Sequence, residues 1–248
     1  MLCKRVIPVL TFNDGVLFRT KTFVPDYRYT LDFVDAWSAD EIVVLDVTRP
    51  GTGARANFET VVSNFARRCF VPLAAGGGVR ALDDVRRLMG IGADKVVVNT
   101  GAFDRPALVG EIARSYGVQC VVGCVDARRT DTGYEAMVEF GRRGTGLAPE
   151  DWARRLEGEG AGEILVQSVE RDGSLLGYDI DLARRVRAAV RVPVLLASGA
   201  GNWKHFAEAF READADAACT TNIYHFTETS IASAKAYLAG AGVPVRTS

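Results

Sequence analysis

The stretch GEILVQSVERDGSLLGY, Gly162 to Tyr178, decides the fold. Its apolar run, Ile164 to Val169, is interrupted by only two polar residues, which is typical of a strand covered on both faces in a parallel sheet. The polar, glycine-containing segment that follows, Glu170 to Gly177, cannot continue that strand. We therefore predict a buried strand followed by a loop that carries functional groups.

A related pattern occurs earlier in the chain, at Asp40 to Thr52, DEIVVLDVTRPGT. An offset of 122 residues aligns the two stretches and also aligns positions elsewhere. The aligned pairs include Glu41 with Glu163, Ile42 with Ile164, Val47 with Val169, Arg49 with Arg171, Gly51 with Gly173, and Gly77 with Gly199. This self-similarity predicts one duplicated half-structure over residues 1–248, with half-repeats of about 1–120 and 121–248. Two independent α/β domains are the alternative, but no Pro/Ser-rich linker or charge run separates the halves.

Length and composition restrict the class of protein. The 248 residues are 48% hydrophobic, which suffices for a large core, and 30 basic residues balance 31 acidic ones. This balance indicates neither nucleic acid nor an anionic membrane as a partner. The apolar runs have the length of strands and no secretory segment precedes the first, so we expect a soluble, cytoplasmic protein. The five scattered cysteines predict buried free thiols, with no disulfide framework and no metal site.

Eight apolar runs of strand length recur along the chain, and a helical pattern follows each of them. The runs are Arg5 to Leu10, Glu41 to Leu45, Val71 to Ala75, Lys95 to Asn99, Gln119 to Val125, Glu163 to Val169, Val192 to Ala197 and Asp216 to Thr220. The first helical pattern depends on Leu31 and Val34. Strand and helix alternating eight times, at roughly 30 residues per unit, predict a single (β/α)8 TIM barrel of the α/β class. An open doubly wound sheet is the alternative, and the half-chain repeat argues against it.

Two connections depart from this regular alternation. The first, Thr11 to Thr30, is long for a compact barrel, which favours a functional or mobile loop. The second, Ala127 to Arg142, has turn residues followed by a partly alternating run, which predicts a small hairpin after the fifth strand. Both follow strand ends, so we expect them at the end of the barrel where the strands finish, here called the mouth. The opposite end, where the strands begin, is called the floor.

The strand ends at the mouth are rich in glycine and in hydroxyl-bearing residues. Two glycine clusters, Gly76 to Gly78 and Gly199 to Gly201, favour backbone N–H groups that bind two phosphates on opposite sides of the mouth. For any single glycine, a tight turn is an equally good explanation.

Two aspartates at strand ends, Asp46 and Asp126, could act as acids or bases, or could simply cap the helices that follow. Asp126 is the stronger catalytic candidate because it ends an apolar strand, where burial can tune a carboxyl pKa. Its counterpart at the end of the first strand is Thr11, whose hydroxyl cannot replace a proton-transferring carboxylate near neutral pH.

The stretches KRVIPVL, AAGGGV, ADKVVVNT, CVDARR, GAGEILVQSVERDGSLLGYD and HFAEAF resemble the HisF family, the cyclase subunits of imidazole glycerol phosphate synthase. The resemblance covers essentially the whole chain. It implies a TIM barrel without a cofactor that receives ammonia from a HisH-type glutaminase docked at the floor. In that family, ammonia reacts with the bisphosphorylated substrate PRFAR to give imidazole glycerol phosphate and AICAR, and aspartates at the ends of strands one and five transfer protons.

At the mouth, some residues match the family's functional residues and others depart from them. The fifth-strand aspartate is Asp126, but Thr11 stands at the first-strand position. Losing a positioned acid–base group typically costs ~10² to 10⁴ in rate, so a poor cyclase is expected. The implied phosphate-binding residues are Gly77, Gly78, Asn99 and Thr100 at one site, and Asp172, Gly173, Gly199 and Asn222 at the other. Ser198, Thr221 and Asn222 replace the family's usual Gly, Ala and Ser, and Gln167 replaces a smaller hydroxyl residue.

The floor keeps the family's pattern. Arg5, Glu41, Lys95 and Glu163 start strands one, two, four and six, and they match the ring of charges that gates the ammonia channel in that family. Two acids and two bases can pair fully, as charges aimed into a barrel require, whereas solvated strand starts are the alternative. Asp94 and Gln119 match positions at the glutaminase interface.

Two shorter stretches narrow the resemblance: FRTKTF, Phe18 to Phe23, and CFVPLAAGGG, Cys69 to Gly78. They resemble a HisF paralogue group, WbuZ or second HisF, associated with amidation of bacterial surface sugars. We therefore expect a HisH-type glutaminase partner, a phosphorylated small molecule as ligand, and a sugar amidotransferase as a further partner. The alternatives are a histidine-pathway cyclase, in which Asp14 or Asp46 stands in for the missing carboxylate, and a scaffold that only activates its glutaminase.

Overall fold

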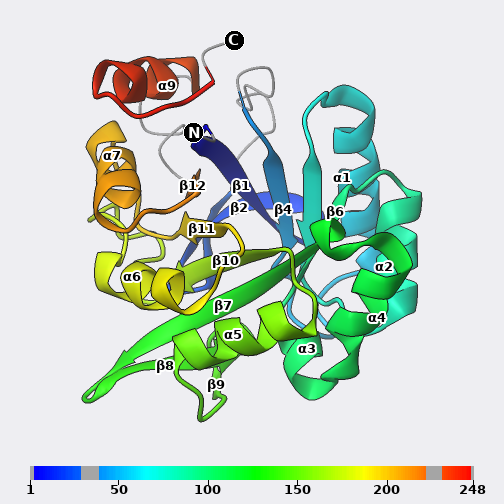
Figure 1. Ribbon diagram of the computed structural model, residues 1–248. Coiled ribbons are helices and arrows are strands. Elements are labelled where there is room, and N and C mark those ends of the chain that lie inside the picture. Colours follow the sequence, from blue (N-terminus) through cyan, green and yellow to red (C-terminus); the bar gives the residue numbers. More distant parts are fainter. Residues whose placement is uncertain (1–2, 29–38, 222–230, 247–248) are drawn as a thin grey trace.

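The computed structural model describes residues 3–28, 39–221 and 231–246 (Figure 1). Within these ranges, eight parallel strands pair side by side and close into a ring, which confirms the predicted TIM barrel. Around the barrel the strands are β1 (Arg5–Asn13), β4 (Ile42–Asp46), β5 (Leu73–Gly76), β6 (Lys95–Val98), β7 (Val121–Thr130), β10 (Glu163–Ser168), β11 (Val194–Ala197) and β12 (Ala217–Thr220). The pairing of β12 with β1, in which Cys219 lies opposite Ile7, completes the closure.

Helices surround the strands (Figure 1). They are α1 (Arg55–Arg68), α2 (Leu82–Gly90), α3 (Thr100–Asp104), α4 (Ala107–Tyr116), α5 (Pro149–Glu159), α6 (Ile180–Ala189), α7 (Trp203–Glu212) and α9 (Ile231–Gly240), and a 3-10 turn, Val118–Cys120, precedes β7. None of these helices has the length and hydropathy needed to span a membrane. The helix predicted around Leu31 and Val34 lies outside the described residues, as does Asn222.

Alternate residues of each barrel strand face either the helices or the barrel axis. In β1, Val6 and Leu10 belong to the large core shared with the helices, whereas Ile7 and Val9 belong to a separate core inside the barrel. The inner core is Ile7, Val9, Val43, Ala74, Val97, Val122, Cys124, Leu165, Leu195, Ala197, Ala217 and Cys219. Because the period is two, Arg5 and Thr11 share the inward face of β1, one at the floor and one at the mouth.

The long first connection is β-structured, so the expectation of a loop over Thr11 to Thr30 was wrong where this segment is described. β1 continues to Asn13 and pairs in antiparallel fashion with β2 (Val16–Lys21), which pairs with β3 (Val24–Arg28). The β1–β2 turn is Asp14-Gly15, and both residues have positive φ, as a tight two-residue hairpin requires.

The hairpin predicted after the fifth strand is confirmed. β7 extends to Thr130 and pairs with β8 (Gly133–Val138), which pairs with the short β9 (Arg143–Gly144). Figure 1 shows β7 and β8 projecting together from the barrel.

The five cysteines are all free. Cys124 and Cys219 are buried in the inner core, as predicted, because they occupy inward positions of β7 and β12. Cys3 is exposed, and Cys69 and Cys120 are only partly buried, so the prediction of buried thiols was wrong for residues outside the strands.

Candidate functional site

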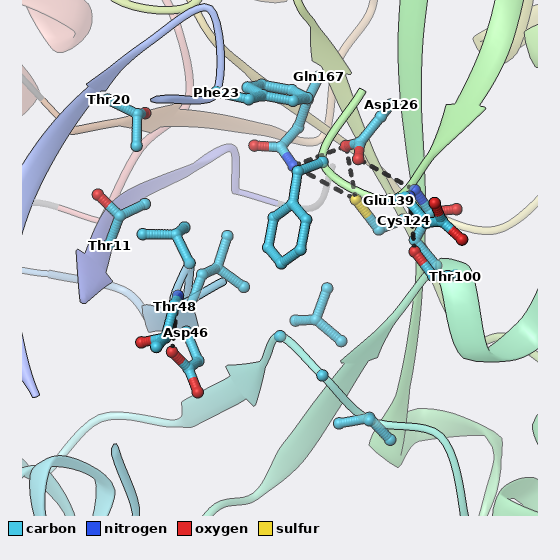
Figure 2. A pocket seen from close by; sticks show the side chains of 18 of the residues that line it. Thr11, Thr20, Phe23, Asp46, Thr48, Thr100, Cys124, Asp126, Glu139 and Gln167 are labelled. Carbon is cyan, nitrogen blue, oxygen red and sulfur yellow. Dashed lines mark hydrogen bonds between the residues drawn. The ribbon is translucent and has the colours of Figure 1, made fainter. Parts of the chain in front are cut away.

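A cavity of about 370 Å³ lies at the mouth, a volume suited to a small metabolite. It is lined by residues from the ends of β1, β4, β5, β6, β7, β10 and β11 (Figure 2). Predicted site residues among them are Thr11, Asp46, Gly77, Gly78, Asn99, Thr100, Asp126 and Asp172. The structure therefore gathers around one cavity most of the residues that the sequence predicts for the mouth.

Asp126 is the most strongly perturbed carboxylate in the cavity. Its Oδ1 accepts hydrogen bonds from Gln167 Nε2 at 3.0 Å and from the Cys124 thiol at 3.3 Å, and its Oδ2 accepts one from Asn99 Nδ2 at 3.0 Å. Burial raises the pKa of Asp126 to about 6, although these three donors act in the opposite direction. A carboxyl group with a pKa close to neutrality suits general acid–base chemistry.

Asn99 orients Asp126 and is itself held from two sides. Its Nδ2 also donates to the Met137 carbonyl at 2.9 Å, and its Oδ1 accepts from Trp152 Nε1 at 3.3 Å. The side chain of Asn99 is therefore fully engaged with protein groups. If Asn99 contributes to phosphate binding, as the sequence predicts, it does so through its backbone. Thr100 begins α3, and its hydroxyl accepts the backbone N–H of Glu139 at 2.9 Å.

Thr11 lies across the cavity from Asp126 (Figure 2). Its side chain is 6% exposed, and its hydroxyl donates to the carbonyl oxygen of Phe18 on the paired strand β2. The Thr11 hydroxyl therefore helps to hold the β1–β2 hairpin together. Neither this hydroxyl nor the carbonyl that it contacts can take up or release a proton near neutral pH.

The two carboxylates weighed as replacements for a first-strand aspartate differ in position. Asp46 lines the cavity, but its Oδ2 is paired with Arg55 Nη1 at 3.2 Å and its Oδ1 accepts the N–H of Thr48 at 3.0 Å. Asp14 does not line the cavity: it is exposed, and its carboxylate accepts from Asn57 Nδ2 at 2.6 Å. Asp14 is therefore poorly placed to replace the missing group.

The second predicted phosphate site is only partly assembled at the cavity. Asp172 lines it but is 8% exposed, and its carboxylate accepts from the Thr20 hydroxyl at 3.0 Å and the Phe23 N–H at 2.9 Å. It thereby fastens the β2–β3 hairpin. Gly173 and Gly199 do not line the cavity, because the backbones of Thr20 and of residue 177 respectively pack closely over them.

Gly199→Ala is expected to lower the free energy of unfolding by about 2–5 kcal/mol. Gly199 has φ of +101°, and an added Cβ would overlap the carbonyl oxygen of Gly177. Gly146→Ala is the matched control, since Gly146 has φ of +72° but nothing within 4 Å of its added Cβ, and should lose only about 1 kcal/mol. Urea unfolding measures both, and equal losses would show that the close approach at Gly199 is unimportant.

At the floor, the four predicted charges form a closed ring. Arg5 Nη1 lies 2.9 Å from Glu41 Oε2 and 2.8 Å from Glu163 Oε1, and Lys95 Nζ lies 2.8 Å from an oxygen of each glutamate. Glu41 is 2% exposed, and burial raises its pKa. The alternative of solvated strand starts is therefore wrong, and the charges turn inward and pair across the floor.

Asp94 and Gln119 are exposed next to this ring. Asp94 precedes β6 and accepts the N–H of Leu73 at 2.8 Å through its carboxylate, and Gln119 precedes β7. Two exposed apolar side chains lie at the same end of the barrel: Phe70, 81% exposed, before β5, and Val118, 54% exposed, before β7.

Sequence reasoning missed two arginines in the cavity wall, Arg49 and Arg55, and the aromatic ring of Phe140. Arg49 had a visible signal, because the half-chain alignment pairs it with Arg171 beside a glycine turn. Phe140 had none, since Glu139, Phe140 and Gly141 all take positive φ, which their residue types do not predict.

Comparison with protein families agrees with this arrangement. Residues 7–230 match the model of a family described as histidine biosynthesis protein. The match spans all eight barrel strands but for the first two residues of β1, and it includes the cavity and most of the floor ring. The chain therefore belongs to the histidine biosynthesis protein family, whose HisA- and HisF-type members are TIM barrels.

Proposed function

We propose that this chain is a HisF-like subunit that receives ammonia from a HisH-type glutaminase at its floor and delivers it to a phosphorylated acceptor at its mouth, for amidation of a bacterial surface sugar. The observation that carries the proposal is the closed ring of Arg5, Glu41, Lys95 and Glu163. Four mutually paired charges aimed at a barrel axis contribute little net stability, so their presence favours a functional role.

The floor supports a protein partner. Phe70 and Val118 expose large apolar surface there, beside the polar side chains of Asp94 and Gln119, a mixture common at protein interfaces. A glutaminase docked over this end would cover the charge ring, so that ammonia released at the interface would meet the ring before it meets bulk solvent.

The mouth supports an acceptor other than PRFAR. Burial raises the pKa of Asp126 to about 6 and also raises the pKa of Asp172, but the Asp172 carboxylate is held by Thr20 and Phe23. The wall opposite Asp126 carries Thr11, whose hydroxyl is engaged with a backbone carbonyl. A histidine-pathway cyclase is the second candidate, since Asp46 does line the cavity, although both of its carboxylate oxygens are already engaged, one with Arg55 and the other with the N–H of Thr48.

Thr11→Asp is expected to raise turnover of PRFAR with ammonium salt by about 10² to 10⁴ over the unmodified protein, because it supplies the absent acid–base group. Thr11→Asn, which has the same shape without the titratable group, should not. The assay is release of AICAR by the purified chain. Robust turnover by the unmodified protein would contradict the sugar-amidation proposal and support the cyclase.

The glutaminase is tested separately by adding purified HisH-type protein and glutamine, with glutamate release as the measurement. We expect the unmodified chain to stimulate glutamine hydrolysis and Gln119→Arg to weaken that stimulation. If stimulation occurs but no acceptor ever receives nitrogen, the chain acts only as an activating scaffold.

A further inference from the structure

Gln167 occupies the mouth end of the inward face of β10. Side chains alternate along a strand, so Glu163, Leu165 and Gln167 share the face that points to the barrel axis. Glu163 belongs to the charge ring at the floor, Leu165 belongs to the inner core, and Gln167 lines the cavity. Gln167 therefore lies where the barrel axis opens into the cavity (Figure 2).

The orientation of the Gln167 amide is fixed by the groups beside it. Its Nε2 donates to Asp126 Oδ1 at 3.0 Å and to Cys124 Sγ at 3.3 Å. A flipped amide would place two acceptors, Oε1 and the Asp126 carboxylate, against each other. Figure 2 shows Oε1 turned away from Asp126. No group in the described part of the chain donates to Oε1, and this oxygen is not buried, so the cavity wall offers a ligand one open acceptor here.

The same contacts leave Asp126 with a single open acceptor position. A carboxylate offers about four such positions, two on each oxygen. Gln167 and Cys124 use both positions on Oδ1, and Asn99 Nδ2 uses one position on Oδ2 at 3.0 Å. A proton that Asp126 exchanges with a ligand therefore passes through the remaining position on Oδ2.

The electrostatic surroundings of Asp126 include few ionisable groups. Burial raises the pKa of Asp126, the hydrogen bonds from Cys124, Asn99 and Gln167 lower it, and the negative charge of Asp172 adds to the rise. Cys124 acts as a neutral donor, because burial and the Asp126 charge raise the pKa of its thiol well above the usual value. Loss of the Gln167 donor should therefore raise the pKa of Asp126 further.

We propose that Gln167 is a positioning residue with two contacts: its Nε2 holds Asp126 so that one position on Oδ2 is left for the bound molecule, and its Oε1 accepts an N–H or O–H group of that molecule. The ligand then carries a hydrogen-bond donor close to the atom that Asp126 protonates or deprotonates. Ammonia, amines and hydroxylated sugars meet this requirement. The inference goes beyond the proposed function, since both contacts belong to this chain alone, whether or not a glutaminase supplies ammonia.

The sequence allows a direct spectroscopic test, because it contains two glutamines, Gln167 and Gln119. Labelling glutamine with nitrogen-15 gives two pairs of side-chain amide signals in an NMR spectrum, and the pair that Gln167→Leu removes belongs to Gln167. Gln119 is the matched control, since its Nε2 donates at 3.2 Å to the backbone carbonyl of Tyr116, which does not titrate. We expect the Gln167 signals to shift with a midpoint of about pH 6, as Asp126 ionises, and the Gln119 signals to stay constant.

The variants check that this midpoint belongs to Asp126. Asp126→Asn should abolish it. In Gln167→Leu, the pKa of Asp126, followed by the carbon-13 signal of its carboxyl group, should rise by roughly 0.5–1 pH unit, and in Gln119→Leu it should not change. Gln167 signals in the unmodified chain that stay constant from pH 4 to pH 8, or that shift as before in Asp126→Asn, would overturn the inference even if Gln167→Leu failed to fold.

The acceptor contact is tested on the unmodified chain at pH 7 with ammonium chloride, glycerol and sodium chloride. We expect ammonium chloride or glycerol to shift the Gln167 signals to saturation, and sodium chloride, which carries charge but no donor, to leave them unchanged. A shift with ammonium alone identifies an N–H group, and one with glycerol alone an O–H group. The inference is wrong if neither donor shifts the Gln167 signals more than those of Gln119. A saturable shift in a chain that stimulates no glutaminase would contradict the proposed function and leave this inference intact.

Discussion

Lys95→Met is expected to lower the free energy of unfolding by about 3–5 kcal/mol, because it leaves two buried glutamates facing a single arginine. Lys95 Nζ donates to both Glu41 and Glu163 at 2.8 Å, and its side chain is 16% exposed. Urea unfolding at pH 8 measures the loss.

The loss should shrink on acidification. Burial already raises the pKa of Glu41, and the positive charge of Lys95 opposes that rise. A carboxyl group whose folded-state pKa lies above its unfolded value favours folding most at low pH, and this contribution is lost as the pH rises through the folded-state pKa. Lys95→Met should therefore be closer to the unmodified protein at pH 5 than at pH 8.

Two controls separate charge imbalance from lost packing. Lys95→Met combined with Glu41→Gln leaves Arg5 paired with Glu163, and should recover much of the stability lost in the single variant. Lys204→Met removes a 75% exposed lysine from a surface pair with Glu208 and should cost less than about 1 kcal/mol. A loss at Lys95 no larger than that at Lys204 would mean that the ring behaves as an ordinary surface cluster.

Asp126→Asn is expected to alter both stability and chemistry. Because burial raises the pKa of Asp126 to about 6, its ionisation destabilises the folded state as the pH rises from about 4 to above 6. The full effect corresponds to about 3 kcal/mol, and asparagine, which does not ionise, escapes it. Relative to the unmodified protein, Asp126→Asn should therefore gain about 2.5 kcal/mol of stability between pH 4 and pH 8, measured by urea unfolding, since part of the full effect is already present at pH 4.

The same substitution should reduce ammonia-dependent turnover of whichever acceptor is found by about 10² to 10⁴. Asp131→Asn, at the exposed tip of the β7–β8 hairpin, is the control and should change neither quantity. A stability difference that stays constant from pH 4 to pH 8 would show that Asp126 does not titrate in this range, and would weaken its assignment as an acid–base group.

The barrel and its floor could be predicted because both follow from strand periodicity. The strand-length runs fixed eight units, and Arg5, Glu41, Lys95 and Glu163 each begin one of those runs. Side chains alternate along a strand, so a charged residue two positions before an inward apolar residue also faces the barrel axis. Glu163, Leu165 and Gln167 of β10 illustrate this register. The half-chain repeat also indicated that Glu41 and Glu163 occupy equivalent positions at the starts of their strands.

The mouth was less predictable because loops, not strands, determine it. Asp14-Gly15 was a usable hairpin signal that was overlooked, since Asp-Gly between alternating apolar residues favours a two-residue turn. No sequence pattern could show that Asp172 fastens the β2–β3 hairpin from 149 residues away through the Phe23 N–H, or that Arg49 meets Phe140. Such contacts depend on where two separate loops come to rest.

The two buried thiols of the inner core, Cys124 and Cys219, can serve as chemical probes of the barrel axis. Cys219 lies opposite Ile7 just above the floor, and Cys124 borders the cavity at the mouth. With Cys3→Ser, Cys69→Ser and Cys120→Ser in place, alkylation would occur only on this axis. Burial raises the pKa of both remaining thiols, so both should react slowly while the barrel stays closed. The rate at which Cys219 is alkylated would therefore report how often the charge ring beneath it opens.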